Sequence, residues 1–217
     1  NATVMLGCSE KACRYVFGNS SMSDSRTAVL PDGIDCDRFA FDEETRKKVR
    51  SEYGLENRFV VGHVGHLNPA KNHEKIISVF AEFAKHRVDA ALLLVGDGEL
   101  ESEVRAEASE LCLDDKVVFA GAHTDVERTY QAMDVFIFPS RYEGFGMAMI
   151  EAQASGLACV ASDVVPEDTN ADGRAVYLPL SAPDEAWAAA LLAAPERSTD
   201  STDKVRQAFG IEATVGK

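Results

Sequence analysis

The sequence predicts an α/β fold in which helices cover both faces of a parallel, doubly wound sheet. Five short apolar runs without polar alternation are typical of buried strands, and segments with helical spacing separate them. Strands of this kind alternating with helices indicate a parallel sheet with both faces covered. Each run also precedes a polar or glycine-containing turn, and in open parallel sheets such turns meet in one ligand-binding crevice.

The predicted elements alternate regularly along the chain. Strands of the main sheet are predicted at residues 60–64, 90–95, 116–120, 135–138 and 158–161. Helices between and after them are predicted at 73–85, 99–112, 126–133 and 147–155. Outside this set we predict a strand at 2–7, a helix at 9–17, a polar loop at 164–173, a strand at 175–180, a helix at 184–193 and a short helix at 203–209.

Composition narrows the class of protein. The 217 residues are 46% hydrophobic, enough for one sizeable core. A net charge of -14, from 36 acidic and 22 basic residues, disfavours nucleic acid as a partner. The five cysteines form no Cys-x-x-Cys pair, which argues against structural disulfides or metal. No apolar stretch reaches the length of about 20 residues that spans a bilayer, and no signal-peptide pattern opens the chain, so we expect a cytoplasmic domain.

Residues 143–151, which read E-G-F-G-M-A-M-I-E, carry the clearest chemical signal. They join an apolar strand to a helix that begins near Met147. Gly144 and Gly146 can adopt backbone angles closed to other residues, and the first N–H groups of a helix attract anions. With a rise of about 1.5 Å per residue, Glu143 and Glu151 lie up to roughly 12 Å apart. The two carboxylates can therefore hold hydroxyls at opposite ends of a sugar diphosphate.

In its motifs the chain resembles the donor-binding, C-terminal domain of the GT-B glycosyltransferases of family 4, or group 1. Residues 143–152 reproduce that family's E-G-F-G-x-x-x-x-E-A motif. Further segments match the family in order and spacing at 30–35, 64–72, 94–99, 118–121 and 156–162. The likeness is strongest to bacterial exopolysaccharide and capsule transferases, which often read V-G-H-V-G and K-N-H as 61–65 and 71–73 do here. It implies a Rossmann-like doubly wound sheet.

The resemblance implies roles for three charged residues. The second glutamate of the family motif, here Glu151, accepts hydrogen bonds from the ribose hydroxyls of the nucleotide. The first, here Glu143, faces the transferred sugar. Lys71 matches the lysine that neutralises the leaving diphosphate, where a cation stabilises the negative charge that develops as the anomeric bond breaks.

The other donor contacts implied by the resemblance come mainly from the turns after the strands. These donor-binding positions are Gly65, Gly96, Gly121, Ala122, His123, Gly144, Phe145, Gly146 and Met147. The turns at 96–98 and 121–123 hold the base, and the amides near 145–147 reach the sugar and the diphosphate. The family retains anomeric configuration, needs no metal or cofactor at the diphosphate, and most often uses a UDP-sugar as its substrate.

His66 departs from the family pattern. It stands where relatives usually carry the arginine that shares the diphosphate with Lys71, and we include it among the candidate catalytic residues. Arginine offers a permanently charged fork, whereas histidine is only partly protonated near neutrality. The substitution predicts a weaker diphosphate contact at this position.

The resemblance also divides the chain and suggests its partners. Residues 1–18 match the end of an N-terminal acceptor domain, 19–26 a linker, and 27–217 the nucleotide-sugar-binding domain. We expect a hexose-type sugar to pass to a carbohydrate or lipid-linked acceptor held by the rest of that acceptor domain, so this chain alone is expected to be inactive. A lipid-linked acceptor is compatible with contact between the full-length protein and the inner face of the membrane.

Alternative readings remain open at this point. A nucleotide-binding domain with impaired catalysis would explain His66. A sugar-nucleotide epimerase of the same GT-B architecture would use carboxylates and histidines for proton transfer, although the motif and Lys71 favour a transferase. His63, His66 and His73 could suggest zinc, but no acidic or cysteine partner recurs at ligand spacing. His63, inside a strand, is predicted to be a packed or hydrogen-bonded core residue.

Overall fold

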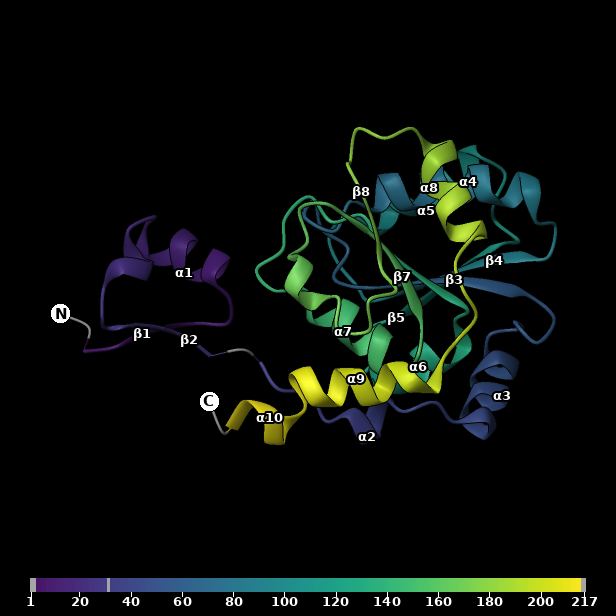
Figure 1. The fold of residues 1–217 in the computed structure, drawn as a ribbon. Helices are drawn as coiled ribbons and strands as arrows, with labels where there is room; N and C mark the ends of the chain where they lie inside the picture. The colour runs from purple at the N-terminus through teal and green to yellow at the C-terminus, as the bar shows by residue number, and fades with distance from the viewer. Residues whose placement is uncertain (1–2, 31, 216–217) are drawn as a thin grey trace.

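A computed structural model describes residues 3–30 and 32–215, and its centre is a six-stranded parallel sheet (Figure 1). The strands of this sheet are β3 (Phe59–Val64), β4 (Ala90–Val95), β5 (Val117–Gly121), β6 (Val135–Phe138), β7 (Ala158–Ser162) and β8 (Val176–Leu178). Their order is β5-β4-β3-β6-β7-β8 and every pair is parallel. The predicted fold class is confirmed.

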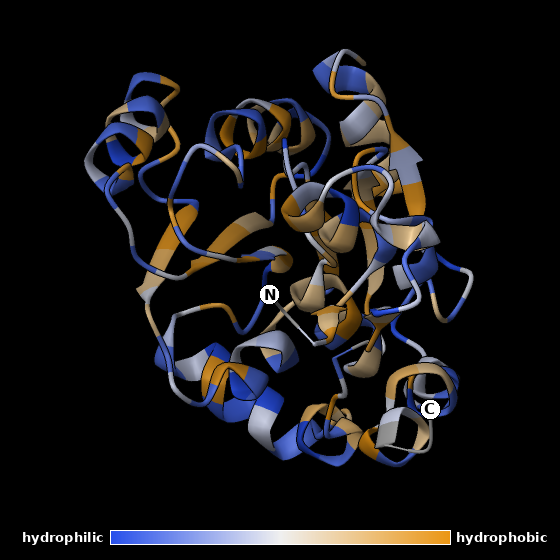
Figure 2. Ribbon diagram, turned by 90° about the vertical axis from the view of Figure 1, so that its left-hand side faces the viewer, coloured by the Kyte–Doolittle hydropathy of each residue, from blue (hydrophilic) through white to orange (hydrophobic). Residues whose placement is uncertain are grey.

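Helices cover both faces of the sheet. On one face lie α4 (His73–His86), α5 (Glu101–Glu110) and α8 (Asp184–Leu192). On the other lie α2 (Cys36–Phe39), α3 (Glu43–Glu52), α6 (Val126–Ala132), α7 (Met147–Ala154) and α9 (Thr199–Phe209). Successive strand residues enter opposite cores, as Val60 and Val61 do. Figure 2 shows the apolar strands between helices with polar outer faces.

The strand order reverses between β3 and β6, which is the topological switch point of the sheet. We call this point the split in the sheet. From β3 the chain continues to one side through α4 and β4, whereas β6 leads to β7 on the other side. The β3–β6 ladder contains only the pairs Val61–Val135 and Gly62–Phe136. Beyond Gly62 and Phe136 the two strands do not pair, and their carboxyl ends lie at the usual ligand position in such sheets.

Two helices, α2 and α3, were not predicted from the sequence. The side chain of Asp42 caps α3 by accepting a hydrogen bond from the Thr45 amide at 2.7 Å, and Glu43 and Glu44 occupy its first turn. The carboxyl end of the chain also differs from expectation. Helix α9 begins at Thr199 rather than near residue 203, and α10 (Ile211–Val215) follows Gly210. None of the described helices is both long and apolar enough for a bilayer span.

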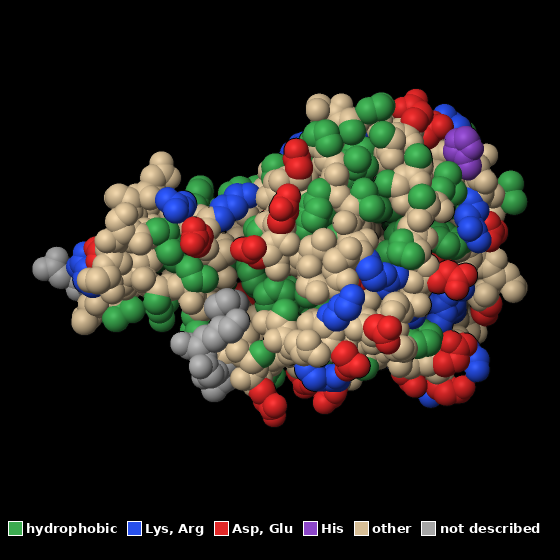
Figure 3. Space-filling model, in the orientation of Figure 1, with side chains coloured by type: hydrophobic (Ala, Val, Ile, Leu, Met, Phe, Trp, Pro, Cys, Tyr) green, Lys and Arg blue, Asp and Glu red, His purple; other side chains and the backbone are tan. Residues whose placement is uncertain are grey.

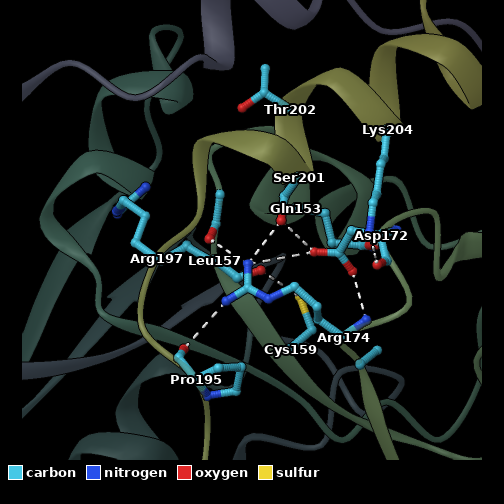
Figure 4. Close-up of polar contacts among 12 residues, drawn as sticks. Gln153, Leu157, Cys159, Asp172, Arg174, Pro195, Arg197, Ser201, Thr202 and Lys204 are labelled. Atoms are coloured by element: carbon cyan, nitrogen blue, oxygen red, sulfur yellow. Dashed lines mark hydrogen bonds and ion pairs between the residues drawn. The ribbon is translucent and has the colours of Figure 1, made fainter.

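Polar contacts hold α9 against the sheet and α7 (Figure 4). The Ser201 hydroxyl donates to Asp172 at 2.7 Å and accepts from Arg174 at 2.8 Å. Arg174 also donates to the Gly156 carbonyl at 3.2 Å, just before β7. Lys204 donates to the Asp172 carbonyl at 3.0 Å. Because Asp172 and Ser201 are buried, these bonds fix the loop that carries η2 (Glu167–Thr169) to α9.

A small unit at the amino terminus stands beside the main body (Figures 1 and 3). It consists of β1 (Met5–Gly7), α1 (Glu10–Phe17), η1 (Ser21–Ser23) and β2 (Thr27–Val29). Strands β1 and β2 pair in parallel, so β2, which we expected in the second domain, lies with the first. The division at residue 26 stays a prediction. Residues 1 and 2 of the predicted first strand, and Pro31 of the 30–35 motif, lie outside the described residues.

Candidate functional site

Backbone hydrogen bonds bring the predicted glycine turns together at the carboxyl edge of the sheet. The Gly65 amide donates to Val95 at 2.9 Å, joining the turns after β3 and β4. The Gly96 amide donates to Gly121 at 2.9 Å, joining the turns after β4 and β5. Three of the predicted donor-binding glycines therefore line one continuous edge.

The turn after β4 requires glycine at position 96. Gly96 has a φ of +135°, and a Cβ atom there would lie 2.1 Å from the Gly65 carbonyl oxygen. We expect Gly96→Ala to lower the free energy of unfolding by about 3 kcal/mol, since backbone strain and overpacking combine. Gly144→Ala is the matched control, because nothing lies within 4 Å of its added Cβ, and it should stay within about 0.5 kcal/mol. Urea unfolding of both variants tests the contrast, and equal losses would contradict it.

Lys71 and Glu143 form an ion pair beside the split in the sheet. The Lys71 Nζ lies 2.6 Å from Glu143 Oε1, and the two side chains are only 20% and 9% exposed. The Ser140 hydroxyl donates to the same carboxylate oxygen at 2.7 Å. Lys71 Nζ also lies 5.0 Å from the centre of the Phe138 ring. Two of the predicted catalytic residues are thus in direct contact, 72 positions apart in sequence.

Glu151 has a separate environment. The Tyr130 hydroxyl donates to Glu151 Oε2 at 2.7 Å. Burial raises the pKa of the Glu151 carboxyl above its ordinary value, and the bond from Tyr130 opposes that shift. The two glutamates of the motif therefore have different protein partners, and their contact with opposite ends of a ligand stays a prediction.

The start of α7 offers unpaired amides. Gly146 is its N-cap residue, with a φ of +97° and no side-chain cap. Gly144, in contrast, is not among the glycines with positive φ, so our expectation of an unusual backbone holds for Gly146 alone. Phe145 is buried and contacts the Phe209 ring at 5.6 Å, which directs its side chain into the core. The Gly144 carbonyl accepts a hydrogen bond from Ser9 of the amino-terminal unit at 2.7 Å.

The predicted histidines are engaged by neighbouring groups. His66, about half exposed, lies 3.2 Å from Asp97 and 3.4 Å from Glu99, so acidic side chains flank the position where the resemblance implies an arginine. His123 Nε2 lies 2.9 Å from the Tyr53 hydroxyl and 3.0 Å from the Ala120 carbonyl. These contacts hold both histidines at the rims of the turns.

Two side chains at the site were missed by the sequence analysis. Ser140 follows the predicted strand at 135–138 at the carboxyl edge, so its place in the chain was a usable signal. Tyr130 lies on α6, 21 positions from its partner Glu151. Nothing local in the sequence marks that contact, because it depends on how α6 packs against α7.

A hollow of about 800 Å³ lies at the opposite edge of the sheet, near the starts of β3 and β6. Arg46, Asp134 and Arg197 are among its lining residues. Arg46 pairs with Asp134 at 2.5 Å, and Arg197 donates to the Met133 carbonyl at 2.8 Å. These groups already have protein partners, and none of the predicted site residues is among those that line this hollow.

The fold and this edge define an α/β protein whose polar and glycine-containing turns gather at the switch point of a doubly wound sheet. Residues 45–207 match the family model described as Glycosyl transferases group 1. The chain therefore belongs to this family. The match continues beyond residue 162, where the last segment that carries the resemblance ends.

Individual relatives agree with that assignment. The whole chain aligns with the putative glycosyltransferase EpsF of Bacillus subtilis at 33% identity, covering 58% of that protein. An Escherichia coli UDP-Gal:alpha-D-GlcNAc-diphosphoundecaprenol alpha-1,3-galactosyltransferase is 33% identical over 64% of this chain and 37% of its own length. A GDP-mannose-dependent mannosyltransferase of Mycolicibacterium smegmatis is 36% identical over 67% of this chain and 41% of its own. The chain thus spans between 37% and 58% of the length of these relatives.

Solved structures show the same fold. Anabaena HepE, crystallised with UDP, superposes with a TM-score of 0.77 at 22% identity, covering 98% of this chain and 61% of that one. At this level of identity the likeness establishes the architecture. The chemistry of this chain rests on its own site residues.

Proposed function

We propose that this chain is the donor-binding half of a retaining glycosyltransferase that moves a hexose-type sugar from a UDP-sugar to a polysaccharide or lipid-linked acceptor. The observation that carries the proposal is the Lys71–Glu143 pair, set between the split in the sheet and the uncapped start of α7. The family and the names of its relatives support the transferase class.

In the proposed complex the nucleotide lies along the carboxyl edge. The turns containing Gly96 and Gly121 face the base, and Glu151 accepts hydrogen bonds from the ribose. Amides at the start of α7 bind the diphosphate or the sugar. When the anomeric carbon–oxygen bond breaks, its electron pair goes to the phosphate oxygen, and the Lys71 cation stabilises that charge.

Acceptor and location belong to the same proposal. One relative is named for a diphosphoundecaprenol acceptor, which supports a lipid-linked substrate at the inner face of the membrane. We infer a cytoplasmic donor domain on that basis. The acceptor itself would be held by the part of the relatives that this chain does not span.

Titration calorimetry with UDP, GDP and ADP, with and without Mg²⁺, tests the donor site. We expect UDP to bind without metal, and Glu151→Ala and Glu151→Gln to weaken it at least tenfold, since hydrogen bonds to a charged group contribute about 1.5–3 kcal/mol. Glu151→Gln is the matched variant because its side-chain oxygen can still accept from Tyr130. Tighter binding of GDP than of UDP would indicate a GDP-sugar donor instead. If both variants bind UDP as tightly as the parent chain, Glu151 is not part of the donor site.

The epimerase alternative predicts a different product. An epimerase converts the free nucleotide sugar without an acceptor, whereas a transferase leaves it intact or releases nucleoside diphosphate. Product analysis of a longer protein containing this chain therefore separates the two classes.

A further inference from the structure

His63 and His73, ten positions apart, meet at the split in the sheet and have no role in the mechanism above. Their rings are 4.9 Å apart and nearly perpendicular. His63 is fully buried and His73 is 2% exposed. His63 was predicted to be a packed core residue, and it does pack against Phe136 and Phe138. Packing alone does not explain why two imidazoles occupy this position.

Two side-chain hydrogen bonds reach backbone carbonyls at the end of β6, where the β3–β6 ladder has ended. His63 Nδ1 lies 2.9 Å from the Ile137 carbonyl oxygen. Asn72 Nδ2 donates to the Pro139 carbonyl at 3.0 Å. Because a carbonyl can only accept, His63 carries its hydrogen on Nδ1 and presents Nε2 as an unprotonated acceptor. These two bonds tie β3 and the residue before α4 to the carboxyl end of β6.

Several buried polar atoms at this point have no protein partner. They are His63 Nε2, Asn72 Oδ1, and both ring nitrogens of His73. Buried polar atoms normally have hydrogen-bond partners, so such a cluster indicates a partner that arrives with another state of the site. Burial keeps the pKa of both imidazoles below the ordinary value, so both are neutral near pH 7.

Gly65 shows where the free nitrogen of His63 points. A Cβ atom on Gly65 would lie 3.0 Å from His63 Nε2 and 3.2 Å from both Lys71 Cδ and Lys71 Cε. The acceptor and the end of the lysine side chain therefore approach the same point, and the missing side chain of Gly65 lets them do so. The Lys71 ammonium group itself is paired with Glu143.

We infer that His63 is a positioning residue for Lys71, a proposal that rests on the proposed donor site. When the nucleotide diphosphate binds, the Lys71 ammonium group leaves the Glu143 carboxylate, and one of its N–H groups donates a hydrogen bond to His63 Nε2, while the His73 ring packs against the imidazole. An ammonium group has three donors, so it can contact His63 and the diphosphate together. A neutral acceptor also leaves the lysine charge available to the diphosphate, whereas a carboxylate offsets it.

Nitrogen NMR of histidine-labelled protein, titrated with UDP, tests this directly. Without UDP, His63 Nε2 should show the resonance of an unprotonated, unbonded imidazole nitrogen, and UDP should shift it towards the hydrogen-bonded position. His86, an exposed residue at the end of α4, is the internal control and should not respond. If UDP binds and the Nε2 resonance does not move, the positioning role is overturned while the donor site stands. If UDP does not bind the parent chain, the donor site and the positioning role fall together.

Variants give a second readout. His63→Phe keeps a ring but removes the acceptor, and we expect UDP affinity to fall about tenfold. His63→Gln can donate to Ile137 and still present an oxygen to Lys71, so it should recover most of that loss. A merely structural role predicts instead that affinity follows the urea unfolding midpoint across His63→Phe, His63→Gln and His86→Phe. That correlation would overturn the inference, and the NMR titration of the parent chain decides the case if His63→Phe does not fold.

Discussion

Replacing Lys71 by methionine is expected to lower the free energy of unfolding by about 3–5 kcal/mol at neutral pH. Methionine keeps the length of the side chain and its apolar contact with Phe138 but removes the charge. Among the described residues, the Ser140 hydroxyl is then the only side-chain partner of the Glu143 carboxylate, which is 9% exposed. A buried carboxylate without a cation either remains charged at high cost or takes up a proton.

The double variant Lys71→Met/Glu143→Gln separates the pair from its surroundings. It removes both charges, and the amide oxygen introduced by Glu143→Gln could still accept from Ser140, so most of the lost stability should return. Urea unfolding of the parent, both single variants and the double variant completes a double-mutant cycle, which gives the interaction free energy of the pair. A loss below about 1 kcal/mol in Lys71→Met would mean that the pair behaves like an exposed one. Lys71→Met and the double variant should both lose UDP affinity, because both lack the cation, so stability and binding should separate in the double variant.

Most of the fold followed from the sequence because buried parallel strands are apolar throughout. The run 90–95 is buried at every position, and its predicted bounds are those of β4. Helix α3 was missed because its ten residues contain a single aliphatic side chain, Val49, so no apolar period marks it. Its signals were the Asp42 cap and the acidic first turn, which are local and weaker.

The candidate site was predicted in part for a similar reason. Glycines and the motif glutamates are marked by neighbouring residues, so their places at the ends of strands could be inferred. The bond from Tyr130 to Glu151 and the His63–His73 contact depend on how separate elements pack together. Strand order decides such contacts, and sequence spacing does not encode the split between β3 and β6.

Because the buried histidines resist protonation in the folded chain, lowering the pH should reduce the free energy of unfolding. Burial lowers the pKa of His73 from 6.5 to about 4, with the nearby Lys71 and His66 adding to the shift. Between these values the unfolded chain holds a proton that the folded chain does not, so stability is lost as pH falls through that window. A shift of this size corresponds to about 3 kcal/mol. His63, whose pKa is also lowered by burial, acts in the same direction.

Glu107 opposes this loss. Burial, with Glu74 and Glu110 nearby, raises its pKa from 4.5 to about 7. The folded chain therefore binds this proton first, and stability rises as pH falls between about 7 and 4.5. The dependence of stability on pH in the parent chain contains both effects. Its slope alone therefore does not assign either effect to a residue. Variants that remove one group at a time are needed.

His73→Phe isolates the histidine contribution. Phenylalanine keeps an aromatic ring against His63 and removes two buried nitrogens that have no partner, so stability at pH 7.5 should not fall below that of the parent. On acidification towards pH 4, the variant should gain about 3 kcal/mol relative to the parent. Glu107→Gln should move the opposite way and lose stability relative to the parent over the same range. Urea unfolding at pH 7.5, 6.5, 5.5 and 4.5 measures both differences, and parallel curves for parent and His73→Phe would show that His73 titrates normally in the folded chain.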